Sequence, residues 1–279
     1  MPTDSDFRCD TEFLKLLTRR NDVDLTLAAL ELARDACPAV EFETTLDWLD
    51  ARADELSSAI ANAADEREAL RELSRCLSKT HGIRGEPSAF DRADSSYLNR
   101  VIETGQGIPI SLSLLYMAVA ERVGIELKGV SAPMHFLARY ESIDGPLFID
   151  AYAGGRIMTA GECLAWLGKL TGLPTDELRF ALRPARPKAI VLRMLNNLKA
   201  LHARQENWPA AWMVQHRLAA LQPASYVERR DLALISLRAE RPGSAIDLLR
   251  SCIGCCPPDE KESLQERLSQ AVATVARWN

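Results

Sequence analysis

Three segments in the middle of the chain carry the residue types of a hydrolytic site. An apolar run opens with Pro109, an apolar stretch with β character holds His135, and the next such stretch ends in Asp150. A histidine serves as a general base when a carboxylate orients it, and a neighbouring thiol or hydroxyl then becomes the nucleophile. This layout is that of a Cys-His-Asp hydrolase core, except that Pro109 stands where such a core needs its cysteine.

The apolar pattern predicts the elements that position these residues. Residues 110–123 are apolar on nearly all sides, which predicts a buried helix with Pro109 at its favoured first position and Gly124 after its end. Short runs with β character are predicted at 127–131, 135–140 and 147–150. Further helices are predicted at 11–19, 24–37, 44–63, 65–78, 97–103, 160–171 and 176–182, with a loop at 81–96.

The chain changes character after a proline-rich linker at 183–187, and the residues beyond this linker contain an internal repeat. Five residue types recur at an offset of 34: Leu198, Arg204, Glu206, Ala211 and Pro223 match Leu232, Arg238, Glu240, Ala245 and Pro257. This is the period of tetratricopeptide helical hairpins. The sequence therefore predicts repeats over 189–279, with the small residues Ala211 and Ala245 buried between paired helices.

Composition narrows the class of protein. Hydrophobic residues make up 47% and charged residues 26% of the 279 residues, with a net charge of −5, so a nucleic-acid partner is not expected. No apolar run reaches the roughly 18 residues of a membrane span, and MPTDSDFRCD lacks the apolar core of a signal peptide. The seven scattered cysteines do not resemble a disulfide framework, and together these features favour the cytoplasm.

Residues 97–165 resemble the transglutaminase-like superfamily, in its SirB1-type branch with C-terminal tetratricopeptide repeats. The resemblance rests on Tyr97-Leu98-Asn99, on the run from Gly107 to Tyr116, on Gly124, on Pro133-Met134-His135-Phe136-Leu137 and on Phe148-Ile149-Asp150-Ala151-Tyr152. It implies an α+β fold: a mostly helical, papain-like domain with a small antiparallel sheet over 1–182, followed by an α-helical repeat domain over 189–279.

In active members of this family, a cysteine opens the buried helix, where the helix N-terminus favours its thiolate. The best match of Gly-x-Cys to this chain places Pro109 at the nucleophile, with His135 as the former base and Asp150 as its partner. Ser111 and Ser113 are weak substitutes, because serines in buried helices usually bond to backbone carbonyls. Cys163 is interpreted first as a small core residue.

Other chemistry-bearing residues have simpler interpretations. His135 could be an ordinary core histidine, but its spacing from Asp150 favours a hydrogen bond between the two side chains. Cys252 and Cys255 have the spacing of a redox or zinc pair, yet they align with Leu218 and Leu221 in the repeat and are predicted to be core thiols. With four histidines scattered along the chain, no metal and no cofactor is expected.

These features predict a pseudoenzyme that binds protein or peptide partners through its repeat surface, its degenerate cleft or both, and the family resemblance implies a regulatory or scaffolding role in a bacterium. One alternative is a cysteine- or serine-type amidohydrolase or acyltransferase with a displaced nucleophile. Another is a degenerate cleft that binds a small molecule through His135 and Asp150. The sequence names neither the partner nor the oligomeric state.

Overall fold

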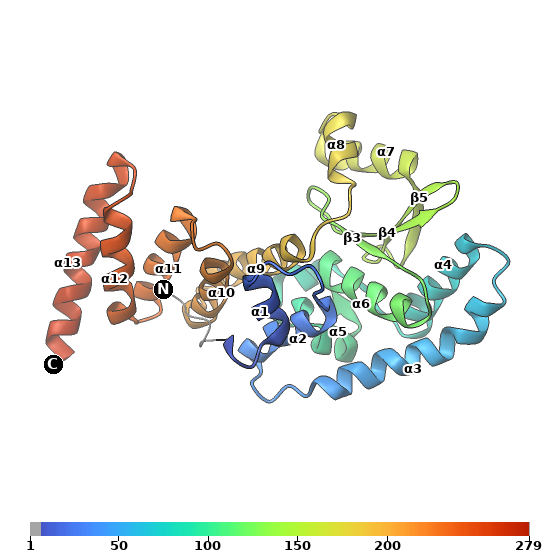
Figure 1. Cartoon of the computed structure of the whole chain (residues 1–279), viewed down its shortest axis with the longest axis horizontal. Helices are drawn as coiled ribbons and strands as arrows, with labels where there is room; N and C mark the ends of the chain where they lie inside the picture. Colours follow the sequence, from blue (N-terminus) through green and yellow to red (C-terminus); the bar gives the residue numbers. More distant parts are fainter. Residues whose placement is uncertain (1–6, 279) are drawn as a thin grey trace. The chain divides into compact units, whose positions relative to one another are not determined.

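The computed structural model describes residues 7–278, which form two compact units (Figure 1). One unit comprises Asn21–Met194, and the other comprises the chain from Leu195 onward together with the described stretch up to Arg20. The fold is α+β, mostly helical with a small antiparallel sheet, as the sequence predicts. The division into family domains at 1–182 and 189–279 stays a prediction.

Helices make up most of the first unit, and capping side chains define where several begin. Asp24 accepts hydrogen bonds from the backbone N–H groups of Thr26 and Leu27, and Asp65 accepts one from Glu68. The helices of this unit are α2 (Leu25–Ala36), α3 (Phe42–Ala61), α4 (Glu66–Ser74), the π-helix η2 (Arg75–Thr80), α5 (Leu98–Thr104), α6 (Pro109–Arg122), α7 (Ala160–Thr171) and α8 (Thr175–Ala181).

The sheet consists of four antiparallel strands in the order β3-β4-β5-β6, namely β3 (Lys128–Val130), β4 (Leu137–Ser142), β5 (Gly145–Asp150) and β6 (Arg156–Thr159). The sequence pattern predicts the first three strands and misses β6. The predicted loop 81–96 also holds regular structure: β1 (Arg84–Gly85) pairs in parallel with β2 (Gln106–Gly107), and short 3-10 turns cover Pro87–Asp91 and Ala93–Ser96.

Helix α6 is the centre of this unit, as its apolar pattern predicts. Leu112, Leu115 and Val119 have no exposed surface and belong to a cluster that includes Leu73 of α4 and Ile149 of β5. Figure 1 shows α6 between helices α3 and α4 and the strands of the sheet. Burial on all sides holds α6 in a fixed place.

The second unit is helical. It contains α1 (Thr11–Leu17), most of α9 (Pro187–Arg204), α10 (Trp208–Leu221), α11 (Tyr226–Arg238), α12 (Pro242–Ile253) and α13 (Lys261–Trp278). Ala211 and Ala245 have no exposed surface, so the predicted close helix contacts are confirmed. Glu206 and Glu240, which are 34 residues apart, both adopt positive φ angles of 54° and 57°. The repeat is therefore reproduced in backbone conformation as well as in residue type.

The prediction for the cysteine pair is half right. Cys252 is buried like Leu218, its equivalent in the preceding repeat. Cys255 is exposed, whereas its equivalent Leu221 is buried, because α12 ends at Ile253 and leaves Cys255 beyond the helix.

Within the described residues, no helix is both long enough and apolar enough to cross a membrane.

Candidate functional site

His135 and Asp150 are brought together by the second and third strands of the four-stranded sheet. His135 Nε2 lies 2.8 Å from Asp150 Oδ1, so the predicted hydrogen bond is present. Asp150 is the last residue of β5, whereas His135 lies two residues before β4 begins. The strand starts two residues later than expected: Met134 takes a left-handed conformation with a φ of 58° in a turn closed by a hydrogen bond from the His135 N–H to the Ala132 carbonyl at 3.2 Å, and the chain enters β4 at Leu137.

The surroundings of His135 fix the orientation of its ring. The rings of Trp166 and Tyr152 lie edge-on to it, with centroids at 5.0 Å and 6.0 Å. Asp150 Oδ1 also accepts a hydrogen bond from the backbone N–H of Ala153 at 3.1 Å. Asp150 is 2% exposed and His135 8% exposed. A histidine held in this way by a buried carboxylate has the arrangement of an oriented general base.

The sequence pointed to Asp150 but not to the two aromatic rings. Tyr152 falls two residues after the aspartate, in the stretch that carries the family resemblance, and Trp166 lies on α7. Neither position follows a spacing that would single it out, because the contact of Trp166 with His135 arises only when α7 packs on the sheet, and that of Tyr152 depends on the path of the chain after β5. Proximity in the folded chain, not sequence spacing, identifies both.

Pro109 occupies the first position of α6, as its sequence context predicts. The preceding Gly107 cannot be replaced easily, since a Cβ atom there would lie 2.9 Å from Ser111 Oγ. Ser111 is fully engaged: its hydroxyl accepts from the Ile108 N–H at 3.1 Å and donates to the Ser95 carbonyl at 2.6 Å. This serine holds the entry of the helix in place, which favours a structural role.

Ser113 is also buried, and its hydroxyl lies 3.4 Å from the Phe136 carbonyl. This contact places the second turn of α6 against the segment that carries His135. A donor with its single proton directed to a backbone carbonyl is poorly placed to attack a substrate. The geometry therefore favours a packing role for Ser113.

Cys163 is the thiol of this unit that responds to the charge of Asp150. It lies on α7 with no exposed surface. Burial, with a further contribution from the negative charge of Asp150, raises the pKa of its thiol to about 12. At pH 7 about one molecule in 10⁵ would carry the thiolate at such a pKa. The site thus has an oriented histidine, but its neighbouring hydroxyls and thiol are occupied or unreactive.

Comparison with known proteins supports the same fold. A family model for the transglutaminase-like superfamily matches residues 43–196, and a tetratricopeptide repeat model matches residues 198–276. The chain is 32% identical over 230 residues to a UPF0162 protein of Xylella fastidiosa strain 9a5c, which covers 81% of this chain and 82% of that protein. It is 24% identical over 232 residues to Protein SirB1 of Salmonella typhimurium, covering 80% and 84% of the two chains.

A eukaryotic protein shares part of the match. F-box only protein 21 of Mus musculus is 28% identical over 190 residues, which cover 65% of this chain and 29% of that protein. The bacterial relatives therefore match most of their own length, whereas this relative shares a segment within a much longer chain.

Proposed function

Because the chain belongs to the transglutaminase-like superfamily, is similar to SirB1 and UPF0162 proteins and carries tetratricopeptide repeats, we propose that it binds other proteins and catalyses no reaction. Its partners would be protein or peptide segments held by the repeat unit. No disulfide joins Cys37, Cys76, Cys163, Cys252, Cys255 and Cys256 in the described part of the chain, which favours a reducing compartment such as the bacterial cytoplasm.

The observation that carries this proposal is Pro109 at the start of α6. A covalent mechanism needs a thiol or hydroxyl that His135 can deprotonate, and a proline ring offers neither. Ser111 holds the helix entry, Ser113 bonds to a backbone carbonyl, and the Cys163 thiol keeps its proton. The His135–Asp150 pair is then retained as a buried structural hydrogen bond.

The repeats supply the binding half of the proposal. Stacked helical hairpins of this period commonly present a groove to helical or extended peptides. An exposed apolar side chain, Val227 at 47% exposure, lies on α11 within the repeated segment. The rival functions are turnover by a displaced nucleophile and binding of a small molecule by His135 and Asp150.

Chemical labelling separates the inactive protein from an enzyme. The native chain would be treated with thiol-directed and serine-directed probes beside a His135→Ala variant. We expect the exposed cysteines Cys37 and Cys255 to be labelled at rates that do not change in the variant. A single residue that labels stoichiometrically, requires His135, and abolishes substrate turnover when replaced would overturn the proposal.

Site-specific crosslinking tests the binding role. A photoreactive residue would replace Val227 of the repeat unit, and a matched control would replace Ile143, which is 95% exposed on the β4–β5 turn of the other unit. Crosslinking in the bacterial cell should give a discrete protein adduct at position 227 and none of the same size at position 143. Equal adduct patterns at both positions would contradict recognition through the repeats.

A further inference from the structure

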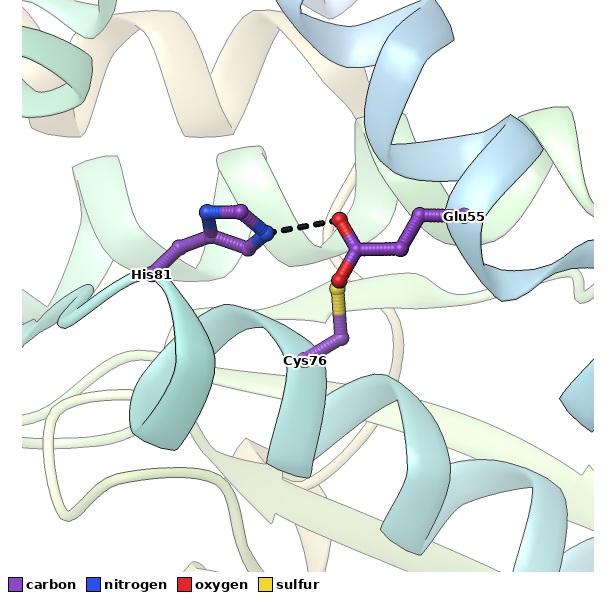
Figure 2. A group of neighbouring side chains, drawn as sticks. All are labelled: Glu55, Cys76 and His81. Carbon is purple, nitrogen blue, oxygen red and sulfur yellow. Dashed lines mark hydrogen bonds and ion pairs between the residues drawn. The ribbon is translucent and has the colours of Figure 1, made fainter.

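A thiol, an imidazole and a carboxylate meet far from the His135–Asp150 pair in sequence. Glu55 comes from α3, Cys76 from η2, and His81 directly follows η2 (Figure 2). One potential ligand atom from each lies within 4.8 Å of the other two. Figure 2 shows the carboxylate between the imidazole and the sulfur, and Glu55 Oε2 lies 2.7 Å from His81 Nε2.

The π-helical turn is what places Cys76 beside His81. On an α-helix, residues five apart point about 140° away from each other. Here the N–H of His81 donates to the carbonyl of Cys76 at 3.0 Å, the i to i+5 bond of a wider turn, so the two side chains come to one side. Single π turns within helices recur at functional sites, because they cost more than regular helix and persist where their geometry is needed.

We propose that Glu55, Cys76 and His81 form a binding site for a zinc ion. Thiolate, imidazole and carboxylate are the three ligand types that zinc takes in proteins, whereas magnesium and calcium prefer oxygen alone. The three ligands leave the fourth tetrahedral position to solvent on the side of Glu55, which is exposed. Ligand atoms around zinc lie about 3.5 Å apart, so the sulfur must approach by roughly 1 Å.

The side chains of this cluster already interact with one another and with Arg52. The carboxylate of Glu55 accepts from His81 and lies 3.3 Å from Arg52 Nε, and burial raises the pKa of the Cys76 thiol to about 11. A zinc ion would displace the thiol proton and take over the role of the positive partner. Arg52 opposes this, because its charge lies within a few ångströms of the incoming cation.

Binding of Co²⁺ in place of Zn²⁺ can be followed by visible absorption and tests the proposed site directly. The full chain, freed of metal with a chelator, would be titrated with Co²⁺ and then with Zn²⁺. We expect one Co²⁺ per chain with a thiolate-to-cobalt charge-transfer band and tetrahedral visible bands, both removed by Zn²⁺. Cys76→Ser should abolish the charge-transfer band. His81→Gln and Glu55→Gln, at partly exposed positions that spare the fold, should each weaken binding by more than about tenfold.

Controls separate this site from the other thiols. Cys163→Ser removes a buried thiol of the same unit, and a double Cys255→Ser, Cys256→Ser change removes the thiols that follow α12; both should leave the spectrum unchanged. Arg52→Gln should tighten binding, on the order of tenfold at low salt. Absence of the charge-transfer band, a Co²⁺ affinity unchanged in both His81→Gln and Glu55→Gln, or a band lost with Cys255 and Cys256 would each overturn the proposal.

Discussion

The buried carboxylate of Asp150 allows two substitutions to be compared at one position. Its Oδ1 accepts both from His135 Nε2 at 2.8 Å and from the Ala153 N–H at 3.1 Å. Asp150→Ala leaves both donors without this acceptor: the buried imidazole costs about 1–3 kcal/mol and the partly buried N–H about 1 kcal/mol. The free energy of unfolding should therefore fall by about 2–4 kcal/mol in Asp150→Ala.

Asp150→Asn retains an oxygen in the same place. The two hydrogen bonds persist and lose only their charge assistance, so the expected cost is about 1 kcal/mol. Thermal denaturation followed by circular dichroism should show the difference, since each kcal/mol corresponds to about 2–4 °C in a unit of this size. Asp144→Ala, an exposed change on the same hairpin, is the control and should stay within about 0.5 kcal/mol of the native chain. Equal losses in the Ala and Asn variants at position 150 would refute the shared-oxygen argument.

Three further outcomes are expected, each from denaturation of the full chain. Ala245→Leu should lower stability by about 1–3 kcal/mol, because the fully buried site has no room for the larger side chain, and an unchanged unfolding curve would count against close helix packing. Asp10→Ala should cost about 3–5 kcal/mol by removing the 2.6 Å ion pair of the buried Arg217, while the Asp259→Ala control at an exposed position of the same unit should cost far less. Burial lowers the pKa of His202 below its ordinary 6.5, so the unfolded chain binds a proton that the folded chain does not. The contribution of neutral His202 to the free energy of unfolding is fully present above about pH 6.5 and is lost as the pH falls below it. His202→Leu should therefore reduce the fall in the free energy of unfolding at acidic pH.

The candidate site was readable because its chemistry lies in consecutive elements. The apolar run of α6, the histidine before β4 and the aspartate at the end of β5 are each visible in the pattern, and their pairing follows from two adjacent antiparallel strands. The repeats were readable because an offset of 34 survives in side-chain size. The first signal comes from neighbouring segments and the second from a fixed period, and both can be recognised without knowing how the chain folds.

Features that depend on distant packing or on an unusual backbone were not readable. Strand β6 spans only four residues, and its two adjacent apolar residues show no alternation, so only its pairing with β5 defines it. Met134, just before the predicted strand, takes a left-handed conformation that its residue type does not signal. Glu55 and His81 lie 26 residues apart, and a π turn, which no simple periodicity reveals, aligns Cys76 with them.

The path of the chain has a consequence for how the protein is made. The described stretch up to Arg20 belongs to the same compact unit as the residues after Leu195, so the chain leaves that unit and completes the other one before returning. On the ribosome, Asn21–Met194 can fold once Met194 has emerged, whereas Asp10 must wait for Arg217, which is 207 residues later. The first helix made is thus among the last to find its native neighbours. Until then the apolar face of α1, which includes the buried Phe13 and Leu16, has no native cover from its own unit, so nascent chains stalled before Arg217 should engage chaperones through that face.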